Sequence, residues 1–229
     1  MSLAILEAGA PPPDLLARFG HYPAMFERLL GTSATTYEVR AGEFPPDVGR
    51  HSAYLITGSS AGVYEDLAWI DPLMTFLRLA KGRAKLVGIC FGHQVMAQAF
   101  GGRVEKSARG WGIGLHSYPI VRHEPWMDDV PLVSAPASHQ DQVVQPPPGA
   151  ELIASSVFTP YAGFAWGDGM AISFQFHPEM SRDFAAALYD SRRDRIPDVD
   201  AAIASLDAPN DSARIGAWIN RFLSSPQPL

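Results

Sequence analysis

The chain has 229 residues, of which 47% are hydrophobic and 18% are charged, and its formal net charge at pH 7 is −6. This composition is typical of a single globular domain, and it argues against a nucleic-acid-binding protein, which would need clustered positive charge. One cysteine allows no internal disulfide, and the sequence shows no signal-like segment and no long apolar run. We therefore expect a cytoplasmic protein that does not enter a membrane.

The first part of the chain alternates between strand-like and helix-like segments. Strands are expected at residues 3–6, 35–39 and 53–56, and helices at 24–30 and 73–79. This βαβα order predicts an α/β fold with a doubly wound, mostly parallel central sheet flanked by helices. In such a sheet, ligands bind at the carboxyl ends of the strands.

The only cysteine, Cys90, stands between a predicted strand at Lys85–Ile89 and a predicted helix at Phe91–Phe100. Gly88 and Gly92 flank it in the pattern Gly-x-Cys-x-Gly, and a Cβ at either position would crowd a tight strand-to-helix turn. This turn places the sulfur at a sheet end and over a helix N-terminus, which favours the thiolate. The pattern predicts a nucleophile, and the alternative is a buried structural cysteine.

A second elbow-like pattern, Gly-x-Ser-x-Gly, occupies Gly58–Gly62 after the apolar run that ends at Ile56. The residues after it, Val63–Asp66, do not open a clear amphipathic helix, whereas an apolar helical stripe follows Cys90. We therefore interpret Gly58–Gly62 as a glycine-rich loop that faces the cysteine.

Beyond residue 114 the pattern changes to short strands separated by turns. These strands are expected at residues 115–121, 132–134, 142–144, 151–155 and 171–176. They are interpreted as antiparallel additions to the sheet. Helices are expected at 182–191 and 211–223, so that residues 1–229 form one domain with a core at about 3–192 and a helical tail at about 193–229.

His177 and Glu179 form the second candidate catalytic segment. They belong to the stretch Phe174–Glu179, in which apolar and polar residues alternate, and Pro178 favours an extended conformation at His177. In an extended segment the two side chains point the same way, so the carboxylate can orient the imidazole as a base for a thiol. The alternative is a histidine at a sheet edge beside a solvated glutamate.

Together these segments resemble the class I glutamine amidotransferases, including the amidotransferase domain of GMP synthase. The resemblance rests on Gly88–Gln94 and Phe176–Glu179, with weaker support from Ser138–Val143 and Trp111–Gly114. It implies a flavodoxin-like fold and a Cys–His–Glu triad. By the resemblance, Cys90 attacks the side-chain amide of glutamine, His177 is the general base and Glu179 orients it.

The resemblance also implies how the substrate is held. Backbone N–H groups of Phe91 and Gly58 would form the oxyanion hole, although the loop here contains Gly58-Ser59-Ser60 where many relatives have Gly-Gly-Pro. The implied substrate-binding residues are Ser59, Gln94, Ser138, His139 and Gln140.

No metal or cofactor is expected. The histidines lack metal-ligand spacing, and neither a phosphate-binding loop nor a dinucleotide fingerprint occurs in the sequence. Asp141, Glu65 and Asp66 are interpreted as solvated acids, and the alternative is that they assist in the substrate pocket.

Three functions stay open at this level, each with a small-molecule partner. The first is a stand-alone enzyme that hydrolyses the γ-amide of glutamine through a γ-glutamyl thioester and delivers ammonia to a separate synthetase. The second is a γ-glutamyl peptide or amide hydrolase with the same triad, which the altered Gly58–Ser60 loop slightly favours. The third is a catalytically silent binding or regulatory module.

Overall fold

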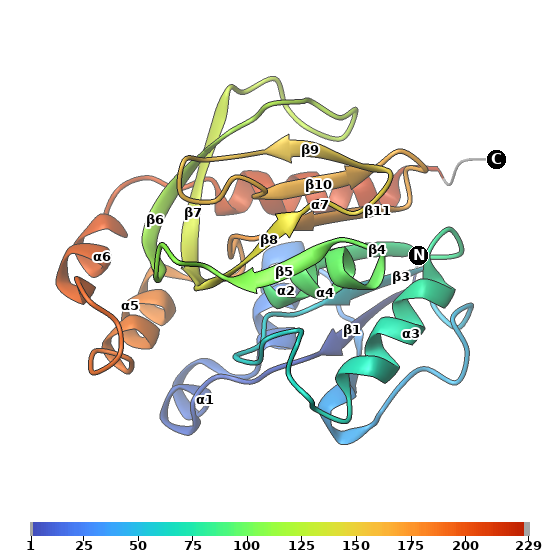
Figure 1. Ribbon diagram of the computed structural model, residues 1–229, viewed down its shortest axis with the longest axis horizontal. Helices are drawn as coiled ribbons and strands as arrows, with labels where there is room; N and C mark the ends of the chain where they lie inside the picture. Colours follow the sequence, from blue (N-terminus) through green and yellow to red (C-terminus); the bar gives the residue numbers. More distant parts are fainter. Residues whose placement is uncertain (1, 227–229) are drawn as a thin grey trace.

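The computed structural model describes residues 2–226 (Figure 1). Its strands are β1 (Leu3–Glu7), β2 (Thr35–Glu38), β3 (Ala53–Ile56), β4 (Lys85–Ile89), β5 (Arg103–Lys106), β6 (Gly112–Pro119), β7 (Leu132–His139), β8 (Asp141–Gln145), β9 (Ala150–Ala154), β10 (Gly163–Trp166) and β11 (Ala171–Phe174). Its helices are α1 (Pro13–Phe19), α2 (Tyr22–Leu30), α3 (Ile70–Ala80), α4 (Phe91–Ala99), α5 (Arg182–Asp190), α6 (Val199–Ser205) and α7 (Ser212–Ser224), and a 3₁₀ turn, η1, spans Val39–Ala41.

A seven-stranded sheet in the order β2-β1-β3-β4-β11-β10-β9 forms the centre of the molecule. The strands from β2 to β11 pair in parallel, and β10 and β9 are antiparallel additions at one edge. The predicted α/β fold with a mostly parallel sheet is confirmed. Two pairs, β5 with β8 and β6 with β7, form separate two-stranded sheets, so the predicted strands at 115–121, 132–134 and 142–144 are not additions to the central sheet. The predicted strand at 171–176 does join it, but β11 pairs with β4 in parallel rather than as an antiparallel addition.

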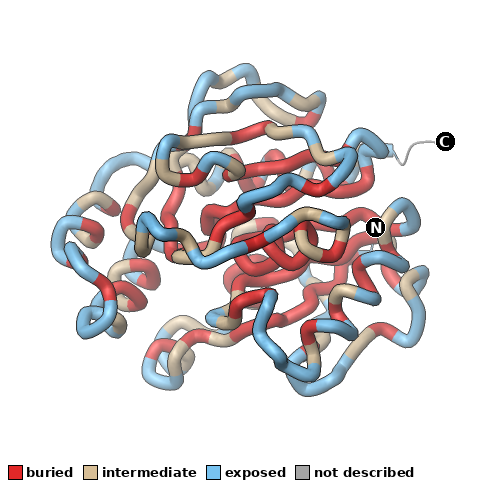
Figure 2. Tube along the Cα trace, viewed as in Figure 1, coloured by how far each residue is buried: buried red, intermediate tan, exposed pale blue. Residues whose placement is uncertain are grey.

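Helices cover both faces of the central sheet. On one face α2 and α7 pack together, and the buried side chains there include Phe26, Trp218 and Phe222. On the other face α3 packs against α4, with Leu77 and Met96 buried. Figure 2 shows the resulting pattern, in which the inner strands are buried and the connecting loops are exposed. Because the inner strands are covered on both sides, most of their side chains are apolar on both faces.

The predicted element boundaries differ from the structure in several places. Three prolines at residues 11–13 favour a loop, yet Pro13 lies in the first turn of α1, where the missing N–H of proline costs no helical hydrogen bond. The short elements β5, β10 and α6 are also absent from the prediction. In the predicted tail, α7 contributes Trp218 and Ile219 to the core, because its apolar stripe faces the sheet.

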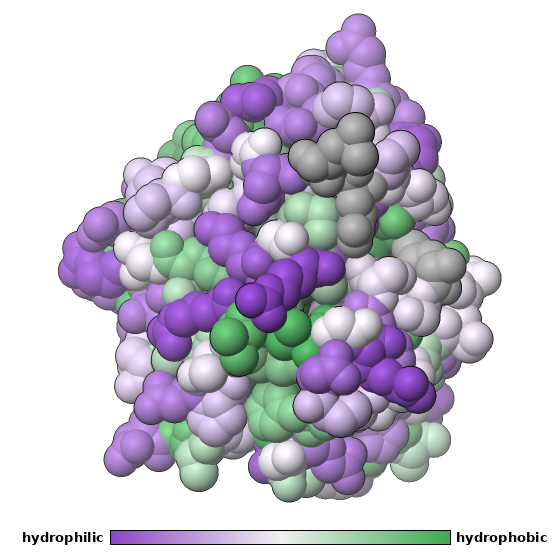
Figure 3. Space-filling view, turned by 90° about the vertical axis from the view of Figure 1, so that its right-hand side faces the viewer, coloured by the Kyte–Doolittle hydropathy of each residue, from purple (hydrophilic) through white to green (hydrophobic). Residues whose placement is uncertain are grey.

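The surface beside the chain termini is a mixture of hydrophilic side chains and smaller hydrophobic areas (Figure 3). Within residues 2–226, no helix combines the length and apolar character needed to cross a membrane.

Candidate active site

Cys90 occupies a strained turn between β4 and α4. Its backbone has φ 54° and ψ −103°, a conformation that L-residues rarely adopt and that costs about 1–3 kcal/mol. A Cβ on Gly88 would lie 2.5 Å from the carbonyl oxygen of Gly92, and a Cβ on Gly92 would overlap the carbonyl oxygen of Ile56. The turn therefore requires both glycines, as the sequence pattern predicts.

The carboxyl ends of three neighbouring parallel strands bring the candidate residues together. Gly58 follows β3, Cys90 follows β4, and His177 comes shortly after β11. A Cβ on Gly58 would lie 3.2 Å from Cε1 of His177 and 3.9 Å from Cβ of Cys90. The absence of a side chain at Gly58 thus lets the loop after β3 approach both of these residues.

His177 and Glu179 form a buried pair. The distance between Nδ1 of His177 and Oε1 of Glu179 is 2.6 Å, and both side chains are almost fully buried. Burial lowers the pKa of His177, but the negative charges of Glu179 and of an ionised Cys90 outweigh it, so that the pKa is raised above its usual value. Within residues 2–226, Nε2 of His177 has no hydrogen-bond partner.

The conformation of this segment differs from the predicted strand. β11 ends at Phe174, and His177–Met180 forms a turn in which the N–H of Met180 donates to the carbonyl oxygen of His177. The two side chains therefore meet across a turn rather than along one face of a strand. The prediction of a contact is correct, and its proposed extended geometry is wrong.

Gln175 contacts Cys90, although the sequence analysis did not predict a role for it. The side-chain nitrogen Nε2 of Gln175 lies 3.5 Å from Sγ of Cys90 and can donate a hydrogen bond to it. Its Oε1 accepts a hydrogen bond of 3.1 Å from Gln94, which also donates to the carbonyl oxygen of Asp141 at 2.8 Å. An amide donor stabilises a thiolate. The sequence did contain an indication of this role, because Gln175 is a polar residue between two aromatic residues, Phe174 and Phe176, which are both buried.

The two predicted oxyanion donors, Phe91 and Gly58, both lie close to Cys90. Phe91 opens α4, and the first N–H groups of a helix have no partner within it. The N–H of Gly58 donates to no backbone carbonyl within residues 2–226.

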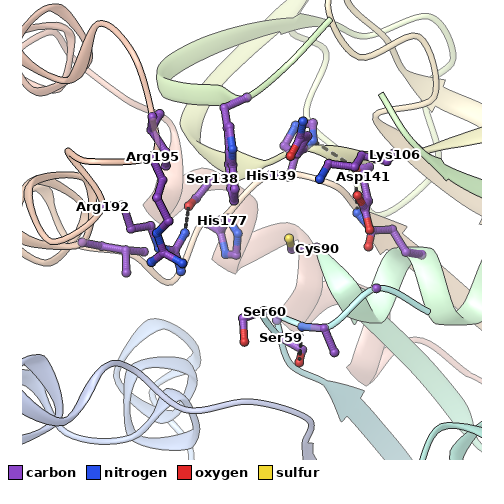
Figure 4. A pocket seen from close by; sticks show the side chains of 18 of the residues that line it. Ser59, Ser60, Cys90, Lys106, Ser138, His139, Asp141, His177, Arg192 and Arg195 are labelled. Carbon is purple, nitrogen blue, oxygen red and sulfur yellow. Dashed lines mark hydrogen bonds between the residues drawn. The ribbon is translucent and has the colours of Figure 1, made fainter. Parts of the chain in front are cut away.

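A cavity of about 260 Å³ lies above Cys90 (Figure 4). Eight of the ten predicted site residues line it, namely Gly58, Ser59, Cys90, Gln94, Ser138, His139, Gln140 and His177. Phe91 and Glu179 lie behind this wall, and each is buried.

The polar groups of several wall residues bond to the protein itself. Oγ of Ser59 accepts from the N–H of Ala61, and Oγ of Ser138 accepts from Arg192. Nδ1 of His139 lies 3.2 Å from the carbonyl oxygen of Asp141, and burial lowers the pKa of His139 to about 3. His139 is therefore a neutral wall residue.

The cavity has a predominantly acidic end and a basic end. At the acidic end Asp141, Glu65 and Lys106 line it, and the hydroxyl of Tyr64 donates to Oδ2 of Asp141 at 2.9 Å. Asp141 is partly buried, burial raises its pKa, and it lines the cavity, so this residue fits the interpretation that it assists in the pocket better than that of a solvated acid. At the other end lie Arg192 and Arg195, which the sequence reading missed because they have no recognisable motif.

No group of three or more His, Cys, Asp or Glu residues within 2–226 is arranged to hold a metal ion.

Comparisons with known proteins place these features in a family. The family model "Glutamine amidotransferase class-I" matches residues 58–187, which is more than half of the chain. Gamma-glutamyl peptidase 4 of Arabidopsis thaliana is 31% identical over 184 residues, covering 75% of this chain and 73% of the relative. A GMP synthase of Thermus thermophilus is 36% identical over 187 residues, which is 77% of this chain but only 33% of that enzyme.

Solved structures show the same fold. A glutamine amidotransferase from Thermotoga maritima superimposes with a TM-score of 0.79 at 18% identity, covering 98% of this chain and 99% of that one. The matched segment contains Gly58, Cys90, His177 and Glu179, the residues that meet at the ends of β3, β4 and β11. By sequence and by fold, the chain belongs to the class I glutamine amidotransferase family.

Proposed function

We propose that this protein hydrolyses the γ-amide bond of γ-glutamyl compounds, glutamine included, through a thioester on Cys90. The observation that carries the proposal is the strained Cys90 at the floor of a cavity whose wall also holds His177, with its buried contact to Glu179. Membership of the family and the similarity to γ-glutamyl peptidases support amide hydrolysis as the type of reaction.

The reaction begins with proton transfer. His177 takes the thiol proton of Cys90 at Nε2, and Glu179 holds the resulting imidazolium in place through Nδ1. The thiolate attacks the γ-carbonyl carbon, and the negative charge that develops on oxygen faces the N–H groups of Phe91 and Gly58. His177 then donates its proton to the departing nitrogen, and the C–N bond breaks.

The second half of the reaction restores the enzyme. Water gives a proton to His177 and attacks the thioester carbon, glutamate leaves, and the proton returns to Cys90. In both halves of the reaction Gln175 donates a hydrogen bond to Sγ of Cys90, which stabilises the thiolate form of the cysteine. Water is the only co-reactant needed to balance these steps.

A γ-glutamyl peptide is a second candidate substrate besides glutamine. The cavity continues past His177 to Leu188, Arg192 and Ile196, which leaves room for a leaving group larger than ammonia. If glutamine is the natural substrate, we propose that the ammonia passes to a separate synthetase. We also propose that residues 1–229 act as one domain, which the shared central sheet supports.

The test is glutamate release by the purified protein from glutamine and from a γ-glutamyl dipeptide, side by side, with Cys90→Ala as the blank. Cysteine-dependent release from either compound supports the proposal. No release from either one contradicts it and favours the binding-module alternative.

Glu179→Gln should slow turnover less than removal of His177, because glutamine keeps the shape of the pair and removes only its charge. A general base contributes about 10²–10⁴-fold, and we expect a loss below this range. The measurement is kcat for Glu179→Gln and His177→Ala on the same substrate. Equal losses would show that the Glu179 charge is not simply an aid to His177.

The same substitution should change how stability depends on pH. Since Glu179 raises the pKa of His177, the pair stabilises the fold fully below about pH 6.5, and this contribution is lost as pH rises through the raised pKa. In the wild-type protein the free energy of unfolding should fall over this range. Glu179→Gln should reduce that slope, because it removes one of the two negative charges that raise the pKa of His177, and urea titrations at several pH values measure the change.

Asp141→Asn should raise KM for glutamine and for γ-glutamyl dipeptides alike. Asp141 lies at the acidic end of the cavity, where its carboxylate can bind the α-ammonium group that all these substrates share. The measurement is KM and kcat for both substrate types. An effect on only one type would place the α-ammonium group elsewhere.

A further inference from the structure

Two arginines at the basic end of the cavity have no carboxylate partner. Arg192 and Arg195 follow α5 and line the cavity on the His177 side of Cys90 (Figure 4). None of the ion pairs within residues 2–226 includes either guanidinium group. Arg193, between them in sequence, instead pairs with Asp190 at 2.9 Å and with Asp200 at 2.8 Å.

Arg192 is held in a fixed position at the cavity wall. Its Nη1 donates to Oγ of Ser138 at 3.0 Å, and its guanidinium carbon lies 5.8 Å from the ring centroid of Trp111. Burial is the main cause that lowers the pKa of Arg192, and the nearby charge of Arg195 adds to it, while negative charge on Tyr22 or Cys90 opposes the shift without cancelling it. A partly buried cation beside a second cation is unfavourable unless an anion compensates it. The pair therefore has the properties of an anion-binding site that opens into the catalytic cavity.

The direction of the reaction decides which part of a substrate reaches these arginines. The departing nitrogen must face Nε2 of His177, because His177 protonates it, and Arg192 and Arg195 lie beyond His177 as seen from Cys90 (Figure 4). Asp141 and Lys106 lie on the opposite side of Cys90, where the α-ammonium and α-carboxylate groups of the glutamyl part can bind. The leaving group therefore extends toward the arginines.

We infer that Arg192 and Arg195 bind a carboxylate group carried by the leaving amine. The preferred substrates are then γ-glutamyl amino acids, in which the amine released is an amino acid with a free carboxylate. This inference rests on the proposed function and narrows its substrate class. Met180, Leu188 and Ile196 line the same end of the cavity and provide an apolar surface for the carbon atoms of that amino acid.

The test compares three substrates that share the glutamyl part: γ-glutamyl-leucine, the same dipeptide with its carboxylate converted to an amide, and glutamine. The wild-type protein should show the highest kcat/KM for the free dipeptide. Arg192→Gln and Arg195→Gln should each reduce the preference for the free dipeptide over its amide by about 10- to 100-fold, since charge-assisted hydrogen bonds are lost.

Two further variants serve as controls. Arg193→Gln should keep the preference, because Arg193 pairs with carboxylates of the protein and does not line the cavity. Arg195 is exposed, so Arg195→Gln tests the site even if Arg192→Gln weakens folding. In the Cys90→Ala background, calorimetry of the free dipeptide and its amide gives the same comparison as a ratio of Kd values, without turnover.

The outcomes separate this inference from the proposed function. If Arg192→Gln and Arg195→Gln lowered kcat/KM equally for all three substrates, the inference would be overturned. The arginines would then bind the glutamyl part of the substrate or stabilise the fold. A wild-type protein that favours glutamine, or treats the acid and the amide alike, would overturn it while leaving the proposed function intact. No cysteine-dependent hydrolysis of any of the three would overturn both.

Discussion

Cys90→Ala is expected to lower turnover of any γ-glutamyl substrate by at least about 10⁴-fold, because no other group at the cavity floor can form the thioester. The fold should survive the substitution. Alanine keeps the Cβ of a side chain that lies at the end of β4, and the strained backbone at this position is the same for both residues. The measurement is single-turnover glutamate release, with thermal unfolding of both proteins as the check on folding.

Ser60→Ala is the matched control for this prediction. Ser60 is the serine of the Gly-x-Ser-x-Gly pattern and lines the same cavity, so it is the competing nucleophile suggested by the sequence. Most of the turnover should remain in Ser60→Ala. Turnover retained in Cys90→Ala but lost in Ser60→Ala would reverse the assignment.

Gly92→Ala is expected to destabilise the protein by about 3 kcal/mol or more. The added Cβ would overlap the backbone carbonyl of Ile56 at the end of β3, and neither α4 nor the central sheet can move without disturbing the core on that face. Activity should fall as well, because any shift of α4 displaces Cys90 and the N–H of Phe91. Urea unfolding measures the change in stability.

Gly167→Ala provides the control, since a Cβ on Gly167 would meet no other atom within 4 Å. Its stability should stay close to that of the wild-type protein. If Gly92→Ala were equally stable, the close approach between α4 and β3 would not be a constraint on the elbow.

The triad candidates could be found in the sequence because each depends on a local pattern. Gly88 and Gly92 indicate a sharp turn of the backbone at Cys90, and such a turn depends only on residues that are close in sequence. His177 and Glu179 are two residues apart, so almost any compact conformation keeps their side chains within reach. The prediction of a contact therefore survived even though the segment is a turn rather than a strand.

The fold class was equally accessible, since alternating apolar runs and helical patterns favour a parallel sheet over other arrangements. The boundaries of the strands and the presence of short elements could not be predicted from the sequence. β10 is a short, fully buried strand whose partners, β9 and β11, lie on either side of it in the sheet, and its residues carry no periodic signal of their own.

The sequence by itself determined the family, the doubly wound sheet, and the residues of the turn at Cys90 and of the His177–Glu179 segment. Each of these depends on patterns among residues that are close in sequence. Only the tertiary structure decided the shape and charge of the cavity. Gln175 reaches Cys90 across 85 positions of sequence, and Arg192 reaches Ser138 across 54. Such contacts arise from strand order and helix packing, which bring together residues whose spacing in the chain carries no information about their distance in space.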